Sequence, residues 1–147
     1  MEYKVAIYII FFIGVLFLLH FFYLFILSKR TSKWLSVESI IDTSELEVIN
    51  QGIGNDNSVL YKANVKYQYM IEGKLYSSKR IFIGDFIRNN FSHSAEGLID
   101  KYSKGETILV YYNPQHPNKS VLKTGVHTVI YRELFVAILF LLPTVIV

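Results

Sequence analysis

Residues Val59 to Ile71 read VLYKANVKYQYMI, and every second residue of this stretch is apolar or aromatic. The residues between them are mostly polar, and they include Lys62, Asn64 and Lys66. A two-residue period of this kind is typical of a strand that buries one face and exposes the other. A parallel strand covered on both faces would be apolar throughout, so the pattern predicts an antiparallel sheet.

The segments on either side extend this strand into a sheet. Glu72-Gly73-Lys74 supplies a tight turn, after which Leu75 to Ile83 is predicted to return as the second strand of a hairpin. Trp34 to Asp42 is predicted as an earlier strand. Gln51 to Ser58 is rich in Gly, Asn and Asp, which predicts a loop before the hairpin.

The later part of the central region adds one helix and further strands. Ser94 is a typical cap for a short helix, Thr107 to Tyr112 is rich in β-forming residues, and Ser120 to Leu122 can add an edge strand. We therefore expect residues 33–125 to form a small, mainly antiparallel β domain of four to five strands with one short helix. Such a sheet is either open or curled into a partial barrel.

The first of the two apolar ends is the stretch Val5 to Leu27, which contains no charged residue. As a helix its 23 residues would be about 34 Å long, which exceeds the roughly 30 Å hydrocarbon core of a bilayer. We therefore predict a transmembrane helix over residues 5–27. A cleavable signal peptide is the alternative, but its apolar region of about 7–15 residues ends at small residues, whereas this segment ends in Ser28-Lys29-Arg30.

The second apolar end is shorter. Leu134 to Val147 is uncharged, but its 14 residues would be only about 21 Å long as a helix. A start at Val129 extends this to about 28 Å, provided that Arg132 and Glu133 lie at the membrane interface. We predict a second transmembrane helix within residues 127–147, packed antiparallel to the first. A re-entrant or surface-lying helix is the alternative.

The fold class that follows is membrane α+β, with two transmembrane helices flanking the β domain. The chain has 147 residues, a net charge of +3 and no cysteine. Its basic and acidic residues are interleaved, which argues against nucleic acid as a partner and leaves the lipid bilayer as the expected one. Basic residues follow the first apolar segment and precede the second, so the positive-inside rule places the β domain in the cytoplasm.

The ordered motifs of the central region resemble a known family. These motifs are Trp34; Val65, Tyr67 and Tyr69; Gly73 and Tyr76; Tyr102 and Gly105; Val110-Tyr111-Tyr112-Asn113-Pro114; Pro117; and Val121-Leu122. In this order they resemble the small bacterial membrane proteins grouped as domain of unknown function 3592. The resemblance covers about Trp34 to Gly125 and implies a β domain at the inner membrane of a bacterium. It implies no reaction, because the family has no established one.

No pattern of catalytic or ligand residues is recognisable. The four histidines (His20, His93, His116 and His127) have no metal-ligand spacing, and Gly52-Ile53-Gly54 lacks the third glycine of a phosphate-binding loop. Six tyrosines fall in or beside the predicted strands, which favours a role in the core over a stacking platform: Tyr61, Tyr67, Tyr69, Tyr76, Tyr111 and Tyr112. We therefore expect no enzyme activity, catalytic residue, metal or cofactor.

Three ionisable residues of the apolar ends remain as candidates for a functional or interface role: His20, Arg132 and Glu133. Ionisable groups inside a membrane commonly mark functional sites. For His20 the other interpretation is a neutral imidazole that hydrogen-bonds to a lipid headgroup or to the second helix.

The leading functional hypothesis is a non-enzymatic binding module. In it the β domain binds another membrane or membrane-proximal protein, or a second copy of the chain. One alternative is an immunity or envelope-protection protein that neutralises a toxin. The other is an accessory subunit of a membrane transporter or channel, in which His20, Arg132 and Glu133 would line a path.

Overall fold

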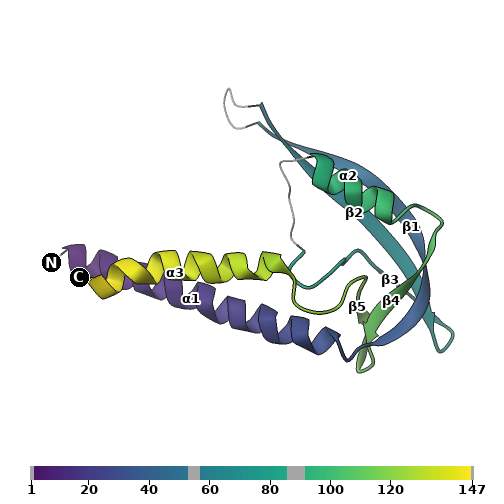
Figure 1. Cartoon of the computed structure of the whole chain (residues 1–147), viewed down its shortest axis with the longest axis horizontal. Helices are drawn as coiled ribbons and strands as arrows, with labels where there is room; N and C mark the ends of the chain where they lie inside the picture. Colours follow the sequence, from purple (N-terminus) through teal and green to yellow (C-terminus); the bar gives the residue numbers. More distant parts are fainter. Residues whose placement is uncertain (1, 53–56, 86–91, 147) are drawn as a thin grey trace.

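The structure is a computed structural model that describes residues 2–52, 57–85 and 92–146 (Figure 1). A helix stands at each end of the chain and a five-stranded sheet lies between them. In chain order the elements are α1 (Glu2–Thr31), β1 (Leu35–Gly52), β2 (Asn57–Ile71), β3 (Lys74–Ser78), α2 (Ser92–Lys101), β4 (Thr107–Asn113), β5 (His116–Val121), the 3-10 helix η1 (Thr128–Ile130) and α3 (Tyr131–Ile146).

The sheet has the strand order β3-β2-β1-β4-β5, and all neighbours are antiparallel. The long strand β1 pairs with β2 from Ser39 to Gly52 and with β4 from Leu35 to Ile40. The two zones overlap at Ser39 and Ile40, and a bulge between Ile41 and Thr43 shifts the register of β1 against β2. Five antiparallel strands and one short helix confirm the predicted architecture of the central region.

Two buried tyrosines curl this sheet into a partial barrel. Tyr67 and Tyr69 of β2 are 0% and 2% exposed and lie in the hydrophobic core. The Tyr69 hydroxyl donates to the carbonyl of Pro117 at 2.6 Å, and the Tyr67 hydroxyl lies 3.1 Å from Oγ of Ser120. Both partners belong to β5, at the far edge of the sheet, so these hydrogen bonds draw the two edges together. For these two tyrosines the core role is confirmed.

Strand β1 is much longer than the predicted strand, which ended at Asp42. The additional residues pair with the first half of β2, where polar side chains match across the strands: Glu47 stands opposite Lys62, and Asn64 Nδ2 donates to Glu45 Oε1 at 2.9 Å. The predicted loop over Gln51 to Ser58 was therefore too long, since both its ends belong to strands. Its middle, residues 53–56, lies outside the described residues.

Strand β3 ends at Ser78, so the predicted strand over Leu75 to Ile83 was also too long. Ile81, Phe82 and Ile83 are all buried, which a strand with one exposed face does not allow for three consecutive residues. Instead the chain bends here, and the amide of Ile81 donates to Oδ2 of Asp85 at 2.6 Å.

The terminal helices run side by side in opposite directions, so that both ends of the chain lie far from the sheet (Figure 1). Gly14 of α1 allows this close approach, because a Cβ atom there would lie 2.8 Å from Leu141 of α3. Among the described residues α1 is the one helix long and apolar enough to cross a membrane, over Lys4–Thr31. Helix α3 has 16 residues, about 24 Å of helix.

Candidate functional site

The structure brings the three predicted candidates of the apolar ends together. His20 of α1 places its Nδ1 atom 3.4 Å from Oε2 of Glu133 on α3, and Arg132 NH2 lies 3.6 Å from Oε1 of the same carboxylate. Contact of His20 with the second helix, one of the two partners considered for it, is therefore confirmed. The Glu133 side chain is 12% exposed, whereas His20 and Arg132 are 46% and 64% exposed.

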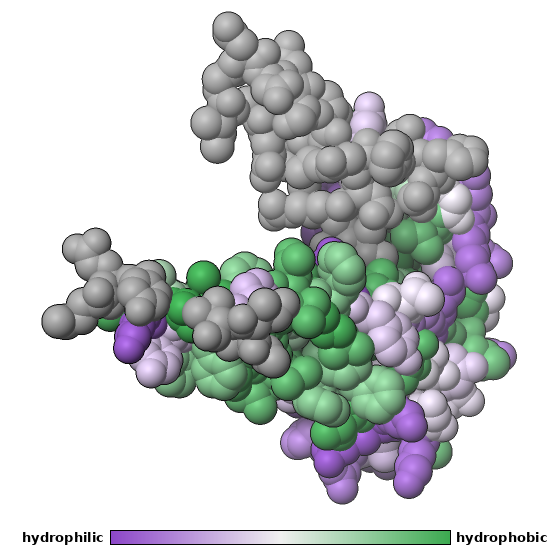
Figure 2. Space-filling view, turned by 60° about the vertical axis from the view of Figure 1, so that its left-hand side comes forward, coloured by the Kyte–Doolittle hydropathy of each residue, from purple (hydrophilic) through white to green (hydrophobic). Residues whose placement is uncertain are grey.

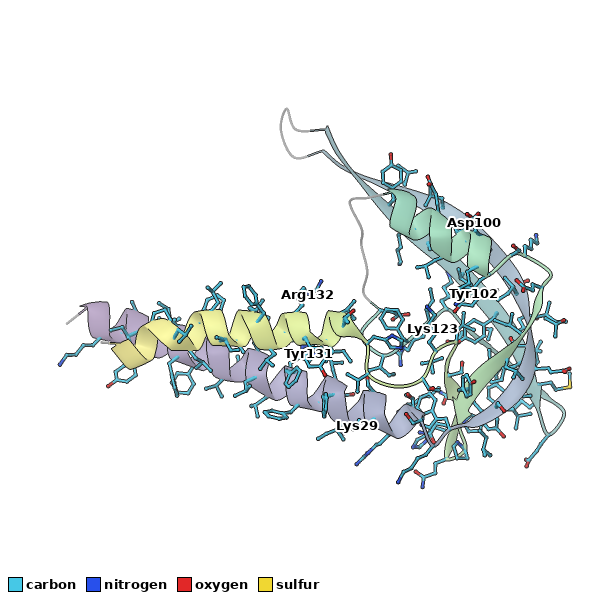
Figure 3. The ribbon with its side chains drawn as sticks, in the orientation of Figure 1. Lys29, Asp100, Tyr102, Lys123, Tyr131 and Arg132 are labelled. Carbon is cyan, nitrogen blue, oxygen red and sulfur yellow. The ribbon has the colours of Figure 1, made fainter. Side chains whose placement is uncertain are left out.

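This polar cluster lies at the end of the helix pair that is nearer to the sheet. Arg132 stands at the start of α3, and Lys29 projects from α1 on the other side of the pair (Figure 3). The side chains of Arg132 and His20 are thus accessible from outside the helix pair, whereas the Glu133 side chain lies between the helices. The arrangement joins the two helices through a contact between a carboxylate and an imidazole.

The helix pair is fixed to the sheet by an apolar cluster that we call the helix–sheet joint: Phe21, Leu24, Ile83, Val121 and Ile130. Each of these side chains is at most 6% exposed. Thr31 adds a polar tie, because its Oγ1 accepts from the amide of Gly125 at 2.8 Å and donates to the carbonyl of Ser28 at 2.6 Å. The last third of α1 therefore packs against the β domain, which holds the sheet in one orientation relative to the helices.

A cleft of about 580 Å³ opens beside this joint, between β2, β5 and the segment after β3. Four of the residues that line it are cationic, namely Lys62, Lys79, Arg80 and Lys119, and we call it the basic cleft. Its volume is within the usual range for small-molecule sites. In the part of the chain that the structure describes, none of these four cations takes part in an ion pair within 4.0 Å.

One buried phenol ties the two walls of the basic cleft together. The Tyr67 hydroxyl donates to the carbonyl of Arg80 at 2.8 Å on one wall and lies 3.1 Å from Oγ of Ser120 on the other. Burial raises the pKa of Tyr67 to about 12, so this hydroxyl keeps its proton at neutral pH. Because Lys119 directly precedes Ser120, the backbones that carry Arg80 and Lys119 are held at a set separation.

Of the described residues in the lining of the cleft, Asp85 is the one with a carboxylate. Burial raises its pKa, while the hydrogen bond from the Ile81 amide and the charge of Arg80 act in the opposite direction. This carboxylate is therefore engaged in shaping the bend at residues 81–85, and the cleft keeps an excess of positive charge.

Sequence reasoning did not find the basic cleft. Its cations come from β2, from the residues after β3 and from β5, and each looks like an ordinary solvated residue in its own segment. Only the curling of the sheet brings them to one opening. The available signal was the pair Lys79-Arg80 directly before three buried residues, which marks a bend with charges on its outer side.

Of the other histidines, His116 and His127 have side chains that the structure describes. His116 begins strand β5, directly after the turn at Pro114 and Gln115. The His127 ring contacts the Phe82 ring at an interplanar angle of 30°, with ring centroids 4.3 Å apart. The side chain of His93 lies outside the described residues. Within the described part of the chain, no three His, Asp or Glu side chains gather as metal ligands would.

Comparison with known proteins agrees with the resemblance found in the sequence. Residues 37–127 match the family described as Domain of unknown function (DUF3592). A search of curated proteins finds no match. The matched segment contains the basic cleft and nearly all of the sheet, and it leaves out α1 and α3. Since the match covers more than half of the chain, this protein belongs to the DUF3592 family.

Proposed function

We propose that this chain is a membrane protein that spans the bilayer twice and holds its β domain at the cytoplasmic surface as a non-enzymatic binding module. The observation that carries the proposal is the surface of the helix pair. Large apolar side chains cover it, among them Phe12, Leu16 and Phe135, which are 65%, 65% and 68% exposed. Figure 2 shows this apolar surface over the helices and hydrophilic residues over the sheet. Lipid is the solvent in which such a surface is stable.

The second crossing is supported by the course of α3. This helix runs back along α1 to the end that carries the N-terminus (Figure 1). Its length of about 24 Å falls about 6 Å short of a typical hydrocarbon core. A mismatch of that size costs only fractions of a kcal/mol per Å, because bilayers thin locally around short helices.

The binding role is supported by the joint and the basic cleft. The joint orients the β domain, and the cleft offers unpaired charge next to the end of the helices. A rigid, charged opening at the membrane surface suits recognition of a partner there. Purification from detergent-solubilised membranes that repeatedly returned this chain without any bound protein or lipid would count against this role.

Cysteine labelling tests the topology, and the chain suits it because it has no native cysteine. We expect a membrane-impermeant maleimide to label Lys4→Cys and a cysteine added after Val147 in intact cells, and to label Lys74→Cys only after lysis. Protection of the added C-terminal cysteine would show that α3 does not cross. Labelling of Lys74→Cys in intact cells would contradict the cytoplasmic location.

The polar cluster favours a second candidate, an accessory subunit of a transporter or channel. His20 and Glu133 are in contact between two helices, as the groups of a proton path would be. In liposomes that contain the purified chain and a pH-sensitive dye, this function predicts a proton flux that Glu133→Gln abolishes. Equal flux in liposomes with and without the protein would remove this candidate.

A further inference from the structure

We propose that the basic cleft binds a phosphate ester. Four cations, Lys62, Lys79, Arg80 and Lys119, line one opening, and among the described residues that line it Asp85 is the only acid. Clefts lined by one sign of charge concentrate the field of those charges and attract ions of the opposite sign. A phosphate group can accept several charge-assisted hydrogen bonds at once, and an arginine binds it through two parallel N–H groups.

The cleft is built before any ligand arrives. Tyr67 holds its two walls together through the carbonyl of Arg80 and Oγ of Ser120. Arg80 is also anchored through its own amide, which donates to Oγ of Ser78 at 3.3 Å. Binding to a preformed site costs less conformational entropy than ordering a loop, so the site can bind with only a few polar contacts.

The cations of the cleft can bind an anion. Within the described residues none of the four forms an ion pair within 4.0 Å, in contrast to Lys66, whose Nζ lies 2.9 Å from Oδ2 of Asp42. Two of them do have an acidic residue near them, since Glu47 stands opposite Lys62 and the charge of Arg80 acts on Asp85. Asp85 is turned toward the Ile81 amide. Mutual repulsion among the unpaired cations is relieved when a phosphate enters.

The place of the cleft connects it to the membrane. Ser120 and Asp85 line it, and they lie one and two residues from Val121 and Ile83 of the helix–sheet joint. If the helices span the bilayer, the cleft is near the headgroups. The phosphate can therefore belong to an anionic lipid or to a soluble ester, and only the lipid source rests on the proposed function.

Binding is measured on the full chain in nanodiscs. The soluble arm titrates glycerol 3-phosphate onto protein in phosphatidylcholine nanodiscs by calorimetry. The lipid arm compares the Tm of the protein in nanodiscs of phosphatidylcholine alone and in nanodiscs that also contain phosphatidic acid. Each arm is repeated with the double variant Arg80→Gln/Lys119→Gln and with the control Lys74→Gln/Lys104→Gln, which removes the same charge from exposed positions outside the cleft.

We expect a response in at least one arm. In the soluble arm this is measurable binding of glycerol 3-phosphate, and in the lipid arm it is a higher Tm in nanodiscs that contain phosphatidic acid. The cleft variant should weaken affinity by about tenfold or more, since it removes two charge-assisted contacts, whereas the control should change it less than about twofold. A response to glycerol 3-phosphate identifies soluble esters as ligands, and a response to phosphatidic acid alone identifies the lipid headgroup.

Two results would overturn the assignment. One is the absence of a response in both arms, or a response that the two double variants weaken equally. The other is binding of a hexaglutamate peptide by the cleft without binding of either phosphate, which would make it a site for an acidic extended segment. The unliganded Tm of each variant shows that it folds. The cysteine-labelling experiment tests the membrane topology independently. A wrong topology can therefore be distinguished from a wrong ligand.

Discussion

The helix pair and the partial barrel expose opposite kinds of side chain. In the barrel, apolar Val110 is 0% exposed and the charged residues lie outside. In the helix pair, large apolar side chains are up to 68% exposed, whereas the interface contains Gly14, Ala137 and the carboxylate of Glu133 together with apolar side chains. Small and polar residues inside with apolar residues outside is the arrangement of helices in lipid. The barrel follows the rule for water. Under the proposed membrane location, one chain is therefore adapted to two solvents.

The largest expected effect comes from a charge in the barrel interior. Val110→Lys places an ammonium group among the core residues, and we expect it to destabilise the domain by about 4 kcal/mol or more. Leu109→Lys is the matched control, since Leu109 is next in the chain, 55% exposed and opposite Glu38. Resistance to proteolysis in detergent measures the difference. Equal resistance of the two variants would show that the strand does not face a core.

A lysine substitution on the helix pair tests whether the helices are surrounded by lipid or by water. Leu16 is 65% exposed, slightly more than Leu109, so both variants would be tolerated in water. In lipid, Leu16→Lys should cost about 2.5–3.5 kcal/mol of insertion free energy. The fraction of chain that resists alkaline carbonate extraction measures it. If Leu16→Lys and Leu109→Lys were retained equally, α1 would not be in contact with lipid.

A third variant tests how the helices approach each other. Gly14→Leu inserts a side chain where even a Cβ atom would lie 2.8 Å from Leu141, and we expect a cost of about 1–3 kcal/mol in helix pairing. The readout is disulfide formation between Phe17→Cys and Phe140→Cys, whose rings are stacked with centroids 6.1 Å apart. Ala6→Leu, at an exposed position of α1, is the control and should leave the cross-linking rate unchanged.

The smallest effect concerns the closure of the barrel. Tyr67→Phe loses the hydroxyl contacts to Arg80 and Ser120, which should cost about 1–2 kcal/mol at neutral pH. Tyr76→Phe is the control, because no hydroxyl hydrogen bond of Tyr76 occurs among the described residues. Thermal unfolding in detergent compares the two, and an equal Tm would show that the Tyr67 hydroxyl does not hold the edges together.

Tyr67 also predicts a dependence on pH. Its pKa is raised by burial to about 12 in the folded chain, from an ordinary value of 10.0. Below pH 10 the phenol is neutral in both states and its contribution is intact. Between pH 10 and 12 the unfolded chain ionises first, so the stability falls as the pH rises. Tyr67→Phe should show a smaller loss over this interval, and an identical loss would contradict the assignment.

The local sequence patterns predicted which strands form better than they predicted the residues at which the strands end. Two-residue alternation correctly identified β2, and Gly73 its turn, because burial of alternate side chains determines which residues a strand contains. The ends of β1 and β3 were missed for different reasons. The second half of β1 is stabilised by pairing with β2, and β3 is ended by a bend that the Asp85 carboxylate stabilises. The sequence of β1 does not show that it pairs with β2, and the sequence of β3 does not show the role of Asp85.

The two candidate sites also differ in how far the local sequence indicates them. His20, Arg132 and Glu133 were singled out as candidates because ionisable residues stand out in an apolar segment, and the antiparallel pair of helices brings them into contact. Their functional role stays a prediction. The basic cleft was missed because lysine and arginine are common on any exposed strand. Its geometry depends on the two tyrosine hydroxyls that reach β5, a contact across about fifty residues of chain.

The most direct test of the two-solvent account is spin-label accessibility at Leu16→Cys and Leu109→Cys in the full chain reconstituted into liposomes. Both positions are exposed on the surface of the protein. We predict that the label at residue 16 collides more with dissolved oxygen, which concentrates in lipid, and that the label at residue 109 collides more with a water-soluble nickel chelate. Equal and high collision rates with the nickel chelate at both positions would contradict the account.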